Sequence, residues 1–388
     1  MRSEPLTVCV FGTYRKEYNR HQILVKRLHR AGINVIECHE PLWYSTEDRL
    51  EAASGLWVKP NFILRVLRAY LSLLFKGLKS SGYDVMIAGY PGQFDVPLAR
   101  LITWFHRKPL VWDILMSTVQ IGRERGFGEK FPITSRMLSL TEAFAVKLPD
   151  RLILDTPEHK LWFESAYHIS ADRIWLVPLG TDDEIFHPFP GISNPANKRF
   201  RVIYYGTFIP NHGVPYIIEA ARLLNGHLDI SFEFIGDGPD RLKCIELAKT
   251  YQLQNVTFLQ WLERAELIQA ISQAGACLGA FGNTSMAKMT LHNKIYEGLA
   301  MKLPIITADS PAVRQMFEPG KHLFTCDRGR PETLANAILA LKENEKLREN
   351  LAENGYADYL QKYSISVQGK RLAELLLSLI PNHPSVNS

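Results

Sequence analysis

Short apolar segments and amphipathic helical segments alternate along almost the whole of this sequence. Residues 6–11 are apolar and end at a Gly-Thr pair, residues 20–31 carry apolar side chains on one helical face, and residues 35–38 are apolar again. This β-α-β order favours a parallel sheet with helices on both faces, because parallel strands need a crossover connection. The alternation restarts at residue 201, so we predict an α/β protein with two doubly wound sheets.

The length of 388 residues indicates two domains, because a single hydrophobic core rarely grows to that size. Residues 186–198 read FHPFPGISNPANK, a stretch rich in proline and asparagine, and we predict a linker there. We expect a first Rossmann-like domain over residues 1–185 and a second over residues 199–360. Residues 361–388 are expected to form a C-terminal helix and tail that pack back on the first domain.

Composition limits the classes of function. The chain is 46% hydrophobic and 22% charged, which is typical of a globular protein. Its net charge of +5 fits a phosphate-bearing substrate, an anionic membrane surface or a polynucleotide, but no basic patch interleaved with aromatic residues favours nucleic acid. Five scattered cysteines without a metal-binding spacing indicate a reducing compartment, so we expect the cytoplasm and no metal site. No apolar run is long enough to span a bilayer.

The segment 292–310, HNKIYEGLAMKLPIITADS, predicts a helix that runs into a strand. The free N–H groups and the positive dipole end of a helix start favour an anion such as phosphate, and Lys294 adds a full charge. One turn further, Glu297 could accept hydrogen bonds from the two hydroxyls of a ribose. The alternative is an ordinary helix–strand unit, with Lys294 solvated and Glu297 on the helix surface.

Five segments of the chain have a joint order and spacing that is more specific than any one of them. In chain order they are VPLGTDDEIFHP (177–188), IYYGTFIPNHGVPYIIEAARLL (203–224), FIGDGP (234–239), NVTFLQWLERAELIQAISQA (255–274) and NKIYEGLAMKLPIIT (293–307). Together they resemble the retaining nucleotide-sugar glycosyltransferases of family 4, which have the GT-B fold of two facing Rossmann-like domains. The resemblance covers most of the second half and, more loosely, the first β-α-β unit and the strand around Asp113.

The resemblance implies where a nucleotide-sugar donor would bind. Gly206 and Thr207 would form the turn that faces the diphosphate, and Asn293 and Lys294 would contact the same phosphates. Glu297 would hold the ribose, and Ile295 belongs to the same donor-binding set. The remaining donor contacts that it implies are Gly236, Gly238, Leu259 and Trp261 around the base, and Gly12 and Thr13 approaching the phosphates from the first domain.

The chain departs from the family pattern at several positions. The family often has two glutamates separated by seven residues; the second matches Glu297, but Met289 stands at the first. Thr207 and His212 occupy positions where the family often has Arg and Lys. Diphosphate binding is therefore expected to depend more on Lys294, with Lys288 or His212 as further contacts.

On the acceptor side, the resemblance leaves one catalytic candidate besides Lys294. The histidine that the family places after a first-domain strand is replaced within WDILMST, where Asp113 is the nearest polar residue. Asp113 could orient or deprotonate the acceptor, or it could cap the following segment.

The resemblance implies a retaining, metal-independent transfer of a sugar from a nucleotide diphosphate, expected to be UDP, to a hydroxyl of a glycan or lipid-linked saccharide. The donor is a substrate, and no cofactor is expected. Two alternatives stay open: a GT-B nucleotide-sugar epimerase or hydrolase, and a catalytically lapsed nucleotide-sugar-binding protein.

The segment 60–79 predicts a helix that is apolar on nearly every side. Its cations, together with Ser72, fall on one narrow stripe; they are Arg65, Arg68, Lys76 and Lys79. Such a helix is either largely buried or dips into a bilayer surface. We expect burial against the first sheet, with peripheral contact at the inner face of the membrane as the alternative.

Overall fold

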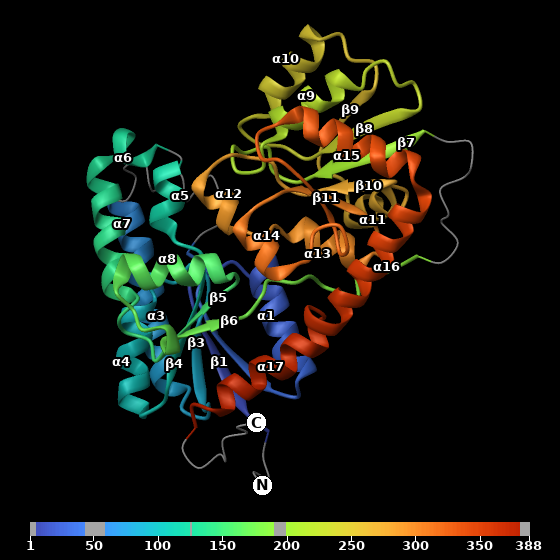
Figure 1. The fold of residues 1–388 in the computed structure, drawn as a ribbon. Coiled ribbons are helices and arrows are strands. Elements are labelled where there is room, and N and C mark those ends of the chain that lie inside the picture. The colour runs from blue at the N-terminus through green and yellow to red at the C-terminus, as the bar shows by residue number, and fades with distance from the viewer. Residues whose placement is uncertain (1–4, 43–58, 125, 190–198, 381–388) are drawn as a thin grey trace. The chain divides into compact units, whose positions relative to one another are not determined.

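The computed structural model describes residues 5–42, 59–124, 126–189 and 199–380. The chain divides into two compact units, Met1–Pro178 with Ile365–Ser388, and Leu179–Ser364. Residues 190–198 of the predicted linker and 381–388 of the predicted tail lie outside the described residues. Both units contain a parallel sheet with flanking helices, which confirms the predicted α/β class (Figure 1).

The sheet of the first unit has six parallel strands in the order β2-β1-β3-β4-β5-β6. Their bounds are β1 Thr7–Gly12, β2 Asn34–His39, β3 Val85–Ala88, β4 Leu110–Leu115, β5 Arg151–Leu154 and β6 Ile174–Leu176. The chain moves outward from β1 to β2 and then returns to β3 on the other side of β1. The direction of winding therefore reverses between β1 and β3, and ligands of doubly wound sheets bind at the carboxyl ends of strands at such a point.

Helices cover both faces of the first sheet. One face carries α1 (Asn19–Arg30) and α17 (Ile365–Leu377), which lie side by side (Figure 1). A Cβ on Gly369 would lie 2.6 Å from the Arg27 carbonyl oxygen, so the absence of a side chain lets the two helices approach closely. The other helices of this unit are α3 (Pro60–Lys79), α4 (Val96–His106), α5 (Thr118–Glu124), α6 (Phe127–Lys130), α7 (Pro132–Ala145) and α8 (Pro157–Tyr167).

Helix α3 is less buried than we expected. Only Ala69, Leu73 and Gly77 are buried, because one face alone can meet the rest of the unit. The large apolar side chains that remain exposed are Ile63, Leu64, Leu67, Leu71, Phe75 and Leu78. The expectation that this apolar helix is largely buried is therefore wrong. None of the helices in the described part of the chain combines the length and the hydropathy that crossing a bilayer requires.

The second unit repeats the architecture, with strands in the order β12-β11-β10-β7-β8-β9. The strand bounds are β7 Phe200–Tyr205, β8 Ile230–Ile235, β9 Val256–Leu259, β10 Ala276–Leu278, β11 Ile305–Ala308 and β12 Phe324–Cys326. The helices are α9 Val214–Leu223, α10 Arg241–Thr250, α11 Arg264–Ser272, α12 Ser285–Met289, α13 Asn293–Ala300, α14 Pro311–Met316, α15 Pro331–Glu343 and α16 Glu345–Lys362. The winding direction reverses between β7 and β10, so the residues after these two strands form the favoured ligand position.

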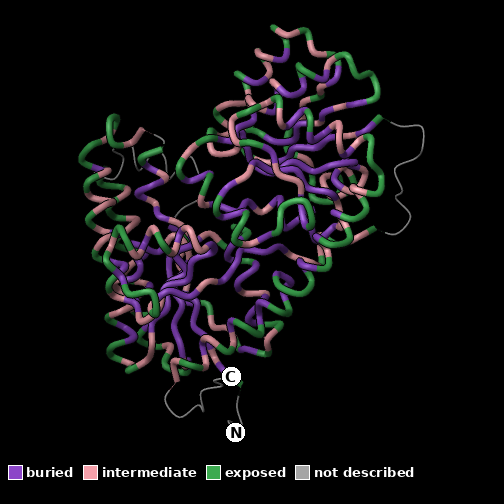
Figure 2. Tube along the Cα trace, in the orientation of Figure 1, coloured by how far each residue is buried: buried purple, intermediate pink, exposed green. Residues whose placement is uncertain are grey.

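The core of the second unit lies between its sheet and the helices α9, α10 and α15. The central strand β7 is buried along nearly its whole length, as Figure 2 shows in purple. Helix α13 is also buried from Lys294 to Ala300, which is unusual for a segment that carries a lysine and a glutamate.

Candidate active site

The turn after β7 brings a lysine against the backbone. Gly206 has φ +137, a conformation that residues with a side chain rarely adopt, and a Cβ there would lie 3.1 Å from Lys294 Nζ. Tyr205 helps to hold the start of α13, because its hydroxyl lies 3.4 Å from the Lys294 carbonyl oxygen. The structure therefore brings together Gly206 and Lys294, as the resemblance implies.

The Lys294 ammonium group is buried without a countercharge in contact. The residue is 5% exposed, and Nζ lies 4.6 Å from the centre of the Tyr204 ring, within cation–π range. No carboxylate of the described residues forms an ion pair with Nζ. Burial lowers the pKa of Lys294 to about 7, while the nearby Glu297 charge acts in the opposite direction. An anion brought to this turn would restore the charged form.

Glu297 lies one turn further along α13 and is also buried, at 6% exposure. Burial raises its pKa to about 7, although a hydrogen bond from Tyr205 and the charge of Lys294 both lower it. The alternative in which Lys294 is solvated and Glu297 lies on the helix surface is therefore wrong. Asn293 and Ile295 flank Lys294 in the first turn of α13, whose N-cap residue His292 makes no side-chain capping bond.

His212 belongs to the same cluster. Its Nδ1 lies 2.6 Å from the Thr207 carbonyl oxygen, which fits donation from an Nδ1–H tautomer, and 3.4 Å from Lys294 Nζ. The hydroxyl of Tyr204 also donates to the Thr207 oxygen at 2.8 Å. Burial, and then the charge of Lys294, hold the pKa of His212 well below its usual value. His212 is therefore neutral here and shapes the turn without adding a positive charge.

The turn after β8 packs directly on the turn after β7. A Cβ on Gly236 would lie 2.3 Å from the Gly206 carbonyl oxygen and 3.3 Å from the Trp261 ring. Gly238 is similarly close to the backbone of Phe208. Trp261 follows Leu259, the last residue of β9, and its side chain stays half exposed. The structure thus brings Gly236 and Trp261 to the Gly206 turn, and a base pocket at this place stays a prediction.

In the first unit, the Gly12–Thr13 turn holds a carboxylate of its own chain. Asp95 accepts hydrogen bonds from the Thr13 backbone N–H at 2.8 Å and from the Tyr70 hydroxyl at 2.8 Å. A Cβ on Gly12, which has φ +136, would lie 2.6 Å from an Asp95 oxygen. The Thr13 N–H therefore already donates to a carboxylate, which lies against Gly12. Its contact with donor phosphates stays a prediction.

Asp113 lies in β4, and both of its oxygens pair with Arg20 of α1. Arg20 Nε is 2.9 Å from Oδ2 and Nη2 is 2.5 Å from Oδ1, with both side chains almost completely buried. A second buried pair, Asp155 and His159, follows β5, with 2.7 Å between Oδ1 and Nδ1. Our sequence reasoning missed Arg20, Asp155 and His159; the polar residues in LILDTPEH directly after an apolar strand were the available signal. A direct role of Asp113 on an acceptor stays a prediction.

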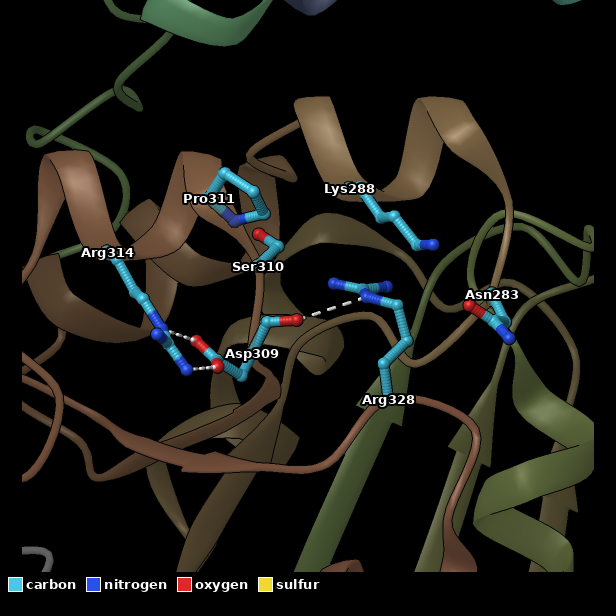
Figure 3. Close-up of a pocket in the computed structure, with 7 residues that line it drawn as sticks. All are labelled: Asn283, Lys288, Asp309, Ser310, Pro311, Arg314 and Arg328. Atoms are coloured by element: carbon cyan, nitrogen blue, oxygen red, sulfur yellow. Dashed lines mark hydrogen bonds and ion pairs between the residues drawn. The ribbon is translucent and has the colours of Figure 1, made fainter.

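Lys288 lies apart from the residues around Lys294. It lines a cavity with Arg314, Arg328 and Asp309, formed by the segments that follow β10, β11 and β12 (Figure 3). Among the described residues, no group of three or more His, Cys, Asp or Glu side chains has an arrangement that could hold a metal ion.

Comparison with known proteins identifies the class. The Anabaena protein HepE, solved in complex with UDP, superposes with a TM-score of 0.71 at 14% identity, covering 97% of this chain and all of that one. Sucrose-phosphate synthase from Thermosynechococcus elongatus gives a TM-score of 0.72 at 14% identity, covering 97% and 99%. The architecture is that of the GT-B fold, as the resemblance predicted.

The second half of the chain is similar to a known protein family. Residues 188–358 match the glycosyl transferases group 1 family. Alpha-D-kanosaminyltransferase of Streptomyces kanamyceticus is 30% identical over 174 residues, which are 44% of each protein, and an uncharacterized glycosyltransferase of Methanocaldococcus jannaschii is 25% identical over 194 residues, half of each protein. The matched region therefore spans about half the length of these curated relatives. Residues 188–358 are therefore similar to a group 1 glycosyltransferase domain.

Proposed function

We propose that this protein is a retaining, metal-independent glycosyltransferase that moves a sugar from a nucleotide diphosphate to a hydroxyl of a glycan or lipid-linked saccharide. The buried Lys294 ammonium group at the Gly206 turn carries the proposal, because it lies where α13 begins and no carboxylate of the described segments contacts it. The departing diphosphate gains negative charge in the transition state, and a fixed ammonium in a dry site stabilises that charge strongly. No cofactor is part of the proposal.

The nucleotide is proposed to bind along the carboxyl ends of β7, β8 and β9. The base would lie against Trp261 and the Gly236 turn, and Glu297 would accept hydrogen bonds from the ribose. HepE has been solved with UDP and with UDP-glucose, which supports a uridine nucleotide as the donor.

Ligand-dependent thermal unfolding tests which nucleotide the protein binds. The full chain is heated with UDP, GDP, ADP, CMP or dTDP, and UDP is expected to raise the melting temperature most, since a ligand of the folded state stabilises it in proportion to the logarithm of its saturation. Anomer-resolved NMR of the product from UDP-glucose then separates the reactions. Transfer with retained configuration supports the proposal, whereas free sugar or an epimer indicates the hydrolase or epimerase.

Glu297→Gln is expected to weaken UDP binding about tenfold, because the amide replaces one strong acceptor for the ribose hydroxyls with a donor. The matched measurement uses 2′-deoxy-UDP, whose affinity should change less between the wild type and the variant. Equal losses for both nucleotides would contradict the ribose contact.

Binding of UDP is expected to take up a proton at mildly alkaline pH. With a pKa of about 7, Lys294 is mostly neutral at pH 8 before binding, and the diphosphate favours the charged form. Calorimetry at pH 8 in buffers of different ionisation enthalpy should give an uptake approaching one proton, with affinity falling as the pH rises above 7. Lys294→Met should abolish the uptake, and an unchanged uptake in this variant would contradict the assignment.

We also propose peripheral contact of the first unit with the inner face of a membrane. The exposed apolar side chains of α3 are joined by Leu101, Trp104 and Phe105 of α4, which packs against α3. The exposed cations Arg68 and Lys79 of α3 favour an anionic lipid surface. This contact would bring the protein to a lipid-linked acceptor.

The double variant Leu67→Glu/Leu71→Glu is expected to lower binding to vesicles containing anionic phosphatidylglycerol by more than tenfold. Each leucine loses about 1.5 kcal/mol or more of apolar burial and gains a charge that the lipid repels. Vesicle flotation measures the effect, with Leu228→Glu in the second unit as the matched control, since Leu228 is also exposed. Wild-type protein that stays in solution would contradict the proposal.

A further inference from the structure

The cavity beside Lys288 opens at the carboxyl edge of the second sheet. Its volume is about 500 Å³, within the usual range for a small-molecule site. Its walls come from the segments after β10, β11 and β12, whereas the Gly206 and Gly236 turns follow β7 and β8. Residues 281–284 connect the two regions, because the Phe281 N–H donates to the His212 carbonyl oxygen at 2.9 Å and the Thr284 hydroxyl bonds Asn211 at 2.9 Å.

The cavity walls carry an excess of positive charge. Lys288, Arg314 and Arg328 face it, against the single carboxylate of Asp309, so two positive charges are unbalanced (Figure 3). Arg314 takes up that carboxylate in a two-pronged ion pair, with 2.8 Å from Nε to Oδ1. The Lys288 side chain makes no hydrogen bond or ion pair with any residue that the structure describes, although its backbone N–H donates to the Thr284 carbonyl oxygen.

Arg328 is held in place by neutral groups. Its guanidinium donates to the backbone oxygens of Gly282 at 2.5 Å, Ala308 at 3.2 Å and Asp309 at 3.2 Å. Because carbonyl oxygens are neutral, they do not cancel the charge of the guanidinium. They accept hydrogen bonds from three of its five N–H groups, so the other two can donate to a ligand. The carbonyls fix the orientation of these donors in advance, which lowers the entropy that a ligand must lose on binding.

We propose that this cavity is an anion subsite that takes the carboxylate or phosphate group of an acidic saccharide. The proposal rests on the proposed function for the saccharide, since the base and diphosphate regions occupy the β9, β8 and β7 end of the edge. The saccharide, which continues beyond the diphosphate, would therefore lie over β10, β11 and β12. The acidic group belongs either to the sugar that is transferred or to the acceptor, and planar arginine donors suit a carboxylate or phosphate in both cases.

Isothermal titration of the full chain with matched charged and uncharged probes tests the proposal. The donor arm compares UDP-glucuronate with UDP-glucose. The acceptor arm compares the binding of free glucuronate with that of glucose, with and without saturating UDP. Ligand-observed NMR follows this binding at saccharide concentrations of tens of millimolar. Wild-type protein is expected to bind the charged probe about tenfold more tightly than the uncharged probe in at least one arm. A nearby unbalanced charge in a partly exposed site provides an attraction of this size.

Three variants assign the preference to the cavity. Lys288→Glu removes the charge excess and should abolish the preference, while Asp309→Asn should increase it several-fold. Lys249→Glu makes the same charge reversal on an exposed lysine in the last turn of α10, at the opposite edge of the sheet, and should leave the preference unchanged. Raised salt should reduce the preference of the wild type.

The outcomes distinguish the transferred sugar from the acceptor as the source of the acidic group. They also distinguish failure of the anion subsite from failure of the proposed function. A preference in the donor arm assigns the acidic group to the transferred sugar, and a preference in the acceptor arm alone assigns it to the acceptor. If UDP fails to bind but free glucuronate is still preferred and Lys288→Glu abolishes this, the subsite stands and the nucleotide function falls. Equal binding of charged and uncharged probes, no binding of either form of glucuronate, or equal effects of Lys288→Glu and Lys249→Glu would overturn the subsite.

Discussion

Lys294→Met is expected to lower kcat by about 10² to 10³, the usual cost of removing one group that stabilises developing negative charge in a dry site. Methionine keeps an unbranched apolar stem over the Tyr204 ring, so the change removes the ammonium group with little change in packing. Steady-state rates of UDP release from saturating UDP-glucose measure the loss. Because the folded protein binds the Lys294 proton weakly, the variant should fold at least as stably as the wild type at pH 7.

Three measurements separate this effect from a structural one. Lys249→Met removes an exposed lysine of the same unit and should leave kcat unchanged. The melting temperature of Lys294→Met without ligand reports its fold, and its UDP affinity reports ground-state binding. A kcat within about threefold of wild type would remove Lys294 from the chemistry and, with it, the main support for leaving-group stabilisation.

The order of segments in the sequence was enough to predict the fold. It also predicted which turns lie at the carboxyl edge of the second sheet. The resemblance placed Gly206 and Gly236 at neighbouring parts of the donor, and the structure shows that the two turns pack against each other. The helix start at Lys294 was likewise predicted. Its burial was not, since the side chain of Tyr204 and the ring of His212 that enclose it come from a strand and a loop about 80 to 90 residues earlier.

Three features lay beyond sequence reasoning, each for a physical reason. Asp95 enters the Gly12–Thr13 turn from 82 residues away, a contact that no local pattern signals. The apolar surface of α3 surrounds the whole helix, so the pattern alone could not show which side would meet the sheet. The charge of the Lys288 cavity arises only when the ends of three neighbouring strands bring Arg314 and Arg328 together, because the residues are scattered along the chain.

Gly236→Ala is expected to lower UDP affinity by at least 100-fold and to destabilise the fold by about 3 kcal/mol. The residue has φ +127, where a side chain brings a strain of about 1 to 3 kcal/mol. The added Cβ would also lie 2.3 Å from the Gly206 carbonyl oxygen, which is backbone and can move only with the whole turn. The two turns must then separate, which withdraws Gly206 from Lys294 and shifts the Trp261 ring. Calorimetric titration with UDP and denaturant unfolding measure the two effects.

The matched control for this prediction is Gly226→Ala in the same unit. A Cβ at Gly226 meets no atom within 4 Å, and the residue does not have a positive φ of the kind that resists a side chain. Gly226→Ala should therefore leave UDP affinity unchanged and alter stability by less than about 1 kcal/mol. If Gly236→Ala bound UDP as tightly as this control, contact between the two glycine turns would have no part in nucleotide binding. The donor would then have to be held by α13 alone.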